Sequence, residues 1–330
     1  MSVVADKSRR YMDADYQELL EVLSDGSVHV HFDPYEDIDW DAPEMRVDKH
    51  DPRWVLHPEL DLLGSHPWYQ AQPLDRQIEI GRFRMTNAIR TGAHFEMLLI
   101  RGLMQYAMDL PNQNPEFRYC MHEMTEECNH IQMFQELTNH VGEDVPGAPR
   151  HLKRAIPWLS AVFGYLPISL MVMILAGEEP IDHYQKAMMR EGHELPPLVQ
   201  RAMQIHIAEE ARHISFASEY LRLNIPRMGR VQKALQSVLF PFAMKLGAYE
   251  IMVSPRKQMR KMGVPDQVYR EAFFGAGSKP IYSSYFDDMR ALCVETGLMG
   301  RVGSWAWRKF GIDGEPSRFR GEPDRTAIIS

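Results

Sequence analysis

Two six-residue stretches, EECNHI at residues 126–131 and EEARHI at residues 209–214, share the pattern Glu-Glu-x-x-His-Ile. Residues three apart on a helix point within about 60° of each other, so Glu127 with His130, and Glu210 with His213, can each hold one metal ion from one helix face. A lone Glu-x-x-His is usually a surface pair, but here the pattern occurs twice. If both stretches lie in a helical core, the repeat predicts two metal ions.

Helix start and stop signals surround both stretches. Asn114-Pro115 has the form of an N-cap followed by proline at the first helical position, and Gly142 is a suitable stop. Pro196-Pro197 opens another helix that should run until Pro226, because a proline inside a helix removes a hydrogen bond and clashes with the preceding turn. Helical spacing also marks residues 74–108 and 168–190, whereas strand-like alternation is scarce. The chain is therefore predicted to be an all-α bundle.

In both helices the pattern falls on the side where a bundle helix normally places its core. The two stripes are Phe117, Cys120, Met124, Glu127, Ile131 and Phe134 in the earlier helix, and Met203, His206, Glu210, His213, Ala217 and Tyr220 in the later one. Two further helices each place one carboxylate, Glu96 or Glu178, on an otherwise apolar stripe. Buried carboxylates are costly unless they are paired or bound to metal, so a cation is expected among them.

Glu, Glu-x-x-His, Glu and Glu-x-x-His from four helices is the ligand arrangement of carboxylate-bridged di-iron and di-manganese bundles. Oxygen-rich ligands with imidazoles suit iron or manganese better than zinc. His206, one turn before Glu210, is either a third imidazole ligand or a core histidine, and we favour the ligand. Spacing does not decide between Glu178 and Glu179. The remaining acidic residues near the motifs lie off the stripes and are expected to support the ligands or face solvent: Glu123, Glu126 and Glu209.

Composition excludes several other classes of protein. Lys and Arg number 37 against 45 Asp and Glu, and the net charge of -8 argues against nucleic acid as a partner. The three cysteines contain no Cys-x-x-Cys, so neither a disulfide framework nor a thiolate zinc site is indicated. The charged residues 1–10 are unlike a signal peptide, and a cytoplasmic location is expected.

Residues 155–177 carry no charge and are long enough to span a bilayer. Pro157, Gly164 and Pro167 interrupt this segment, and a buried bundle helix would be apolar all round in the same way. We therefore predict no membrane span and a central helix that begins near Pro167.

The motifs resemble those of the p-aminobenzoate N-oxygenase family, ferritin-like di-iron enzymes that oxidise aryl amines toward nitro compounds. The similar segments are His66-Pro67, FEMLLI at 95–100, ECNH at 127–130, GEEPID at 177–182 and HIAEEARH at 206–213. The resemblance extends over roughly residues 66–225, about half of the chain. It implies seven metal ligands, with Glu178 taken from the Glu-x-x-Ile-Asp match: Glu96, Glu127, His130, Glu178, His206, Glu210 and His213.

This resemblance implies a ferritin-like four-helix core. The rest of the chain is expected to add further helices and extended arms at both ends. We divide the chain into an N-terminal arm packed on the core (1–65), a di-iron helical domain (66–313) and a loose C-terminal tail (314–330). Two iron ions, with manganese as the alternative, would activate O2 and oxygenate an aryl amine to a hydroxylamine or nitro product. Electrons would come from a separate reductase or ferredoxin, because no flavin or nicotinamide fingerprint is visible. A homodimer is also expected.

Three other functions are compatible with the same residues. The ligands could support di-iron C–H hydroxylation or desaturation, or the chain could be a ferroxidase or metal-storing bundle. It could also be a catalytically silent helical module in which arginines neutralise Glu127 and Glu210.

Overall fold

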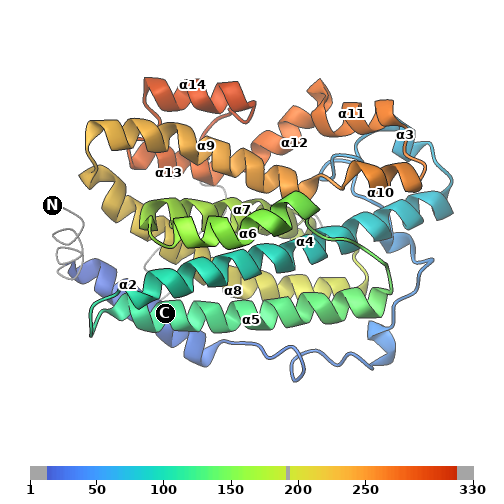
Figure 1. Ribbon diagram of the computed structural model, residues 1–330. Coiled ribbons are helices and arrows are strands. Elements are labelled where there is room, and N and C mark those ends of the chain that lie inside the picture. Colours follow the sequence, from blue (N-terminus) through green and yellow to red (C-terminus); the bar gives the residue numbers. More distant parts are fainter. Residues whose placement is uncertain (1–12, 191–193, 318–330) are drawn as a thin grey trace.

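A computed structural model describes residues 13–190 and 194–317, in which the regular structure is entirely helical (Figure 1). The all-α prediction is confirmed over these residues. Four helices form the central bundle: α4 (Leu74–Met108), α5 (Pro115–Val141), α7 (Pro167–Arg190) and α8 (Pro197–Asn224). α4 packs on α5 and α7, and α8 completes the bundle by packing on α5 and α7.

The boundaries of the two motif helices follow the predicted signals. The Asn114 side chain accepts a hydrogen bond from the Glu116 amide at the start of α5 (2.9 Å), and Gly142 ends α5 with a φ of 67°, which favours glycine. α8 starts at Pro197 and ends two residues before Pro226. Phe117, in the first turn of α5, is 49% exposed, so the predicted core stripe begins one turn later than expected.

The uncharged segment 155–177 divides between two helices. α6 (Arg150–Phe163) lies against α4 at the outside of the bundle, and α7 begins at Pro167 as predicted. α7 carries Leu170, Met171 and Ile174 in the core, whereas Trp158 of α6 is 77% exposed. Among the described residues there is no helix whose length and apolar character would allow it to cross a membrane.

α7 contains a proline immediately after the paired glutamates 178 and 179. Pro180 has no N–H group, so it cannot donate the usual helical hydrogen bond to the carbonyl of Ala176. α9 (Arg230–Met252) packs on α7 at this point, and a Cβ added to Gly247 would lie only 2.0 Å from the Ala176 oxygen. Glycine at position 247 therefore lets the backbones of α7 and α9 approach closely at Ala176, two residues before Glu178.

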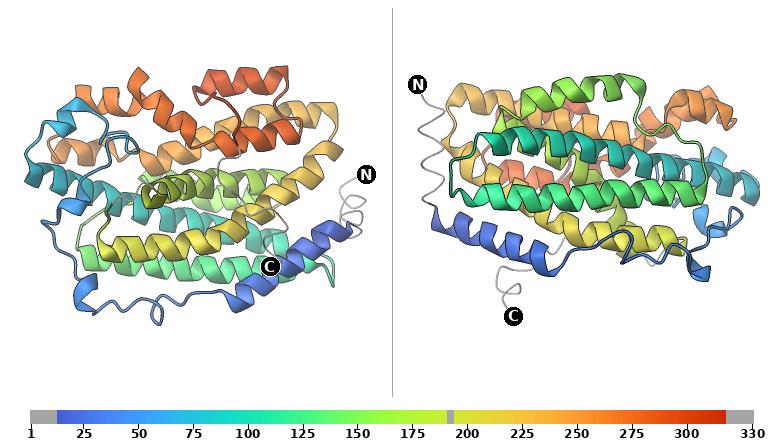
Figure 2. Two further views of the ribbon diagram at one scale, coloured as in Figure 1. Left: turned by 180° about the vertical axis from the view of Figure 1, so that it is seen from behind. Right: turned by 60° about the horizontal axis from the view of Figure 1, so that its bottom comes forward.

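The first helix that the structure describes, α2 (Ala14–His29), was not predicted and packs against α5 and α8. The following chain runs along the same side of the bundle, through the short helices η1 (Pro43–Met45) and η2 (Pro52–Trp54) (Figure 2). The acidic segment 31–45 is largely exposed, with Pro34, Ile38 and Ala42 as buried anchors. The proposed limits of the arm and the core domain stay predictions, and residues 318–330 of the proposed tail lie outside the described residues.

Short helices from the C-terminal part of the chain complete the molecule around α9 (Figure 1). Their bounds, with those of the remaining short helices, are α3 (Pro67–Gln70), η3 (Ile225–Arg227), α10 (Arg256–Lys261), α11 (Asp266–Phe274), η4 (Ala276–Ser278), α12 (Lys279–Ser284), α13 (Asp287–Glu295) and α14 (Arg301–Phe310).

Candidate metal centre

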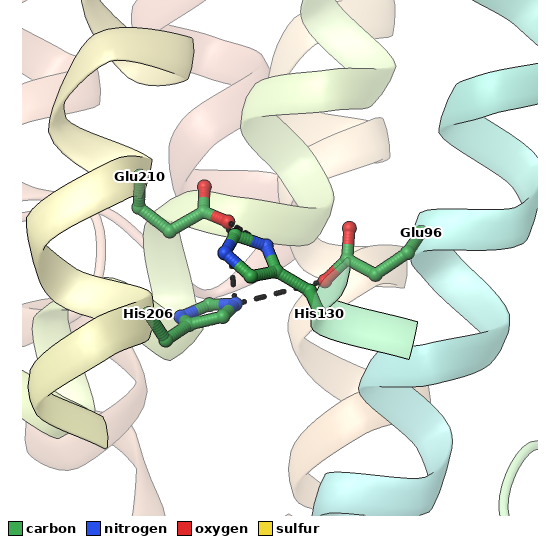
Figure 3. A group of neighbouring side chains, drawn as sticks. All are labelled: Glu96, His130, His206 and Glu210. Carbon is green, nitrogen blue, oxygen red and sulfur yellow. Dashed lines mark ion pairs between the residues drawn. The ribbon is translucent and has the colours of Figure 1, made fainter. Parts of the chain in front are cut away.

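The bundle brings all seven predicted ligands into two adjoining groups. One group contains Glu96, His130, His206 and Glu210, and the other contains Glu127, Glu178, Glu210 and His213. Within each group, one potential ligand atom per residue lies within 4.8 Å of all the others. Figure 3 shows the first group, in which α4, α5 and α8 direct their side chains toward one point. Each of the seven residues is at most 4% exposed.

Glu210 belongs to both groups and faces each with a different oxygen. Its Oε1 lies 3.2 Å from Nε2 of His206 and 3.5 Å from Nδ1 of His130. Its Oε2 lies 3.6 Å from Nδ1 of His213. Ligands at right angles around a metal at about 2.1 Å stand roughly 3 Å apart, so these separations are close to those of a shared coordination sphere. Glu210 is therefore placed to bridge two metal ions.

Several atoms that face the centre have no hydrogen-bond partner. These buried atoms include both oxygens of Glu178, both oxygens of Glu210 and Nε2 of His206. Buried polar atoms in native proteins are normally satisfied, and a cluster of unsatisfied acceptors is stabilised by bound cations. The donor set thus fits metal ions.

The pKa values of the buried carboxylates also indicate a site for cations. Burial, reinforced by the neighbouring carboxylates, raises the pKa of Glu96 and that of Glu178 well above the ordinary value. For Glu127, burial also acts to raise the pKa, but the nearby His213 and His130 outweigh it and hold the pKa well below the ordinary value. Four carboxylates among the candidate ligands carry four negative charges when ionised, which two divalent cations would balance.

The first glutamate of each Glu-Glu pair holds the histidine of the opposite helix. Oε2 of Glu209 on α8 lies 2.8 Å from Nε2 of His130 on α5. In the reciprocal contact, Oε2 of Glu126 on α5 lies 2.8 Å from Nε2 of His213 on α8. A carboxylate on the far ring nitrogen fixes the imidazole orientation and raises its basicity toward a metal. The repeated Glu-Glu-x-x-His pattern therefore contains both the candidate ligands and their supports.

Arg212 and the N-terminal arm surround these two supporting carboxylates. The Arg212 Nη2 donates to Oε1 of Glu126 (2.8 Å) and lies 3.7 Å from Oε1 of Glu209. The backbone N–H of Phe32 donates to that same Glu209 oxygen (3.1 Å), and Asn129 donates to the Phe32 carbonyl (3.1 Å). The arm is thereby hydrogen-bonded to the histidine side of the centre.

His206 is oriented by a residue that the sequence did not identify. Its Nδ1 lies 3.0 Å from Oε1 of Gln185, leaving Nε2 to face Glu210 and Glu96. Gln185 follows Glu178 by two helical turns and therefore lies on the same face of α7, which is the signal that could have identified it. Asp182, one turn beyond Glu178, is also buried, but it lies 3.0 Å from Nζ of Lys186.

The remaining acidic residues and histidines of the motif region take other positions. Glu179 is buried but is not a member of either group, which geometrically favours Glu178 as the candidate ligand. Glu123 is fully buried one turn before Glu127, neither of its oxygens has a hydrogen-bond partner, and burial raises its pKa to about 8. Burial therefore favours the protonated form of Glu123. His94, His122 and His183 lie outside both groups.

A cleft between α4, α6 and α7 reaches the carboxylate side of the centre. Its empty volume, counted together with the adjoining open solvent, is about 450 Å³, and both Glu96 and Glu178 contribute to its wall. The remaining lining is apolar apart from Ser160. The centre is thus covered by the N-terminal arm on its histidine side and approached by an apolar cleft on the other.

The chain combines an all-α ferritin-like fold with buried Glu and His groups that fit a metal site. These features are typical of di-iron proteins. Consistent with this class, the profile of the family described as p-aminobenzoate N-oxygenase AurF matches residues 13–297. The chain belongs to this family, whose members are di-iron oxygenases. The match reaches beyond residues 66–225, so our estimate that the resemblance covers half of the chain was too small: α2 and the helices from α9 to α13 also fall within it.

Relatives of high similarity come from mycobacteria. The uncharacterized protein Mb0909 of Mycobacterium bovis is 51% identical over 319 residues, which cover 96% of this chain and 94% of that protein. The uncharacterized protein Rv0885 of Mycobacterium tuberculosis has the same identity and coverage. No solved structure matches the chain.

Proposed function

We propose that this chain is a non-haem di-iron monooxygenase that oxygenates the nitrogen of an aryl amine. The observation that carries the proposal is the pair of groups joined by Glu210, because its two oxygens face different sets of buried donors. We assign as iron ligands Glu96, Glu127, His130, Glu178, His206, Glu210 and His213. Iron is preferred to manganese on the basis of the family.

The iron pair, when bound and reduced, would supply the activation of O2. The residues of the chain hold the centre in place for this chemistry. Glu209, Glu126 and Gln185 fix the three imidazoles through their far ring nitrogens. The N-terminal arm, through Phe32, limits access of water from the histidine side. The apolar cleft beside Glu96 and Glu178 offers the amine a dry approach.

The first oxygenation step balances as amine, O2, two electrons and two protons giving hydroxylamine and water. The N–H bond is replaced by N–OH, and the second oxygen atom leaves as water. We assign the two electrons to a separate reductase or ferredoxin, and further oxidation of the hydroxylamine would lead to the nitro product. The electron donor and a homodimeric state stay predictions.

Two features of the structure bear on the other functions. A ferroxidase would need a polar path for iron, but the cleft that reaches Glu96 and Glu178 is apolar. A silent module would need arginine beside Glu127 and Glu210, but within the described residues their ion pairs are with histidines, while Arg212 pairs with Glu126 and Glu209. Di-iron C–H hydroxylation uses the same ligands and is separated from N-oxygenation by its products.

The proposal is tested by loading the protein with Fe(II) without oxygen, reducing it and supplying O2 with a panel of aryl amines. We expect about two irons per chain and O2-dependent hydroxylamine or nitro products. The matched control is Glu219→Ala, which removes a carboxylate of α8 that pairs with Arg222, whereas Glu210→Ala should abolish both metal binding and turnover. Less than about one iron per chain, or hydroxylation at carbon alone, would contradict the proposal.

A further inference from the structure

The cleft beside the metal centre has an almost entirely apolar wall. Phe95, Leu98 and Leu99 from α4 face it, together with Phe163 of α6 and Met173 and Ile174 of α7. Since Glu96 and Glu178 belong to different groups of the centre, a molecule in this cleft would lie next to both halves.

The polar residues of this wall are all unsuited to an anion. Glu96 and Glu178 are acidic, and the hydroxyl of Ser160 donates to the carbonyl of Pro157 (3.2 Å). None of the described residues that line the cleft is lysine, arginine or histidine. A carboxylate placed here would lose its hydration without gaining a cationic partner, and buried charges without partners are strongly disfavoured.

The side chains that line the cleft suit an aromatic ring. Phe95 and Phe163 contribute aromatic surface from two helices, and Met173 contributes a polarizable thioether that packs well against rings. Gly177 lies in the wall next to Glu178, where an added Cβ would stand 3.1 Å from Cδ1 of Phe95. The absence of a side chain at position 177 therefore lets the Phe95 ring pack closely against α7 at the wall of the cleft.

From this lining we propose that the substrate is an uncharged, apolar aryl amine and that the chain discriminates against p-aminobenzoate and other anionic aryl amines. The inference rests on the proposed function, because it assumes that the cleft delivers the substrate to the metal centre. It differs from that function in naming the charge and polarity of the substrate.

The test compares p-aminobenzoate with its methyl ester, which has the same ring and amine but no charge. With the iron-loaded, reduced protein and O2, kcat/KM for the ester should exceed that for the acid by at least about 100-fold, because only the acid must bury an unpaired anion. Comparable values for the two, or a preference for the acid, would overturn the inference.

Binding of the same pair to the iron-loaded protein, measured by calorimetry without a reductant, separates this inference from the proposed function. If the ester binds at least about 100-fold more tightly but neither compound is oxidised, the proposed function fails and the charge selectivity of the cleft stands. If neither compound binds, or both bind equally, the inference fails whatever the enzyme turns out to oxidise.

Introducing a cation provides an independent check. Met173→Arg places a guanidinium at the wall of the cleft and should shift the ester-to-acid ratio toward the acid by at least about tenfold. Met104→Arg makes the same substitution at an exposed position of α4 outside the cleft and should leave the ratio unchanged. Iron content of both variants shows whether the centre has formed, and an equal shift in both would count against the cleft as the binding site.

Discussion

Replacing Glu209 with glutamine should weaken metal binding without altering any proposed ligand. Oε2 of Glu209 lies 2.8 Å from Nε2 of His130, while its Oε1 accepts from the Phe32 amide at 3.1 Å and lies 3.7 Å from Arg212. Glutamine keeps the shape of the side chain but removes the charge that holds the buried imidazole. Loss of such an outer partner usually costs about 10–100-fold in metal affinity, equivalent to about 1.4–2.7 kcal/mol. A hydrogen bond to a charged group contributes about 1.5–3 kcal/mol, which agrees with that range.

The assay is an anaerobic titration of the metal-free protein with Fe(II) against a competing chelator. The site that contains His130 should weaken by about 10–100-fold, whereas the site that contains His213 should change much less, because Glu126 still supports that imidazole. Glu219→Gln is the matched control, since Glu219 lies on the same helix and pairs with Arg222 at 3.0 Å near the surface. If both affinities of Glu209→Gln stay within about threefold of the control, His130 is not a metal ligand supported by Glu209.

Three further outcomes are expected. Glu210→Ala should lose both metals and Glu96→Ala only one, because Glu210 belongs to both groups; metal analysis that gives equal losses would speak against a bridging Glu210. Gly247→Ala should lower the free energy of unfolding by more than about 2 kcal/mol, because its Cβ would lie 2.0 Å from the Ala176 oxygen; urea unfolding should show little change for Gly277→Ala, where nothing lies within 4 Å, and equal effects would refute the close approach. In the metal-free protein, burial disfavours the charged His130 ring, but hydrogen bonds to glutamates outweigh it and raise the pKa from 6.5 to about 10. Its contribution to stability is therefore complete below about pH 6.5 and is lost as the pH rises toward 10; urea midpoints of the metal-free protein that increase over this range would contradict the assignment.

Local signals in the sequence were sufficient for the central helices. Asn114, Gly142, Pro167 and Pro197 mark helix ends through backbone geometry that depends only on neighbouring residues. The positions of α2, α6 and α9 depend instead on contacts between distant segments. The close approach of Gly247 to Ala176, for example, joins residues that nothing in the local sequence relates.

The candidate site, like the fold, could be predicted from the sequence only in part. The periodicity of the apolar stripes was enough to select six of the seven residues that the fold places in two groups. Only the family resemblance separated the seventh, Glu178, from its neighbour Glu179. The exchange of partners between Glu126 and His213, and between Glu209 and His130, depends on how α5 and α8 face each other, which spacing along one helix does not define. The backbone amide of Phe32 carries no side-chain signal at all, so its contact with Glu209 could be seen only in the folded chain.

Anomalous diffraction at the iron edge from crystals of the iron-loaded protein tests the central claim most directly. We predict two iron positions on either side of Glu210, one next to Glu96 and His206 and the other next to Glu178 and His213, separated by about 3.5–4 Å. A single iron position, or iron positions away from these residues, would contradict the account.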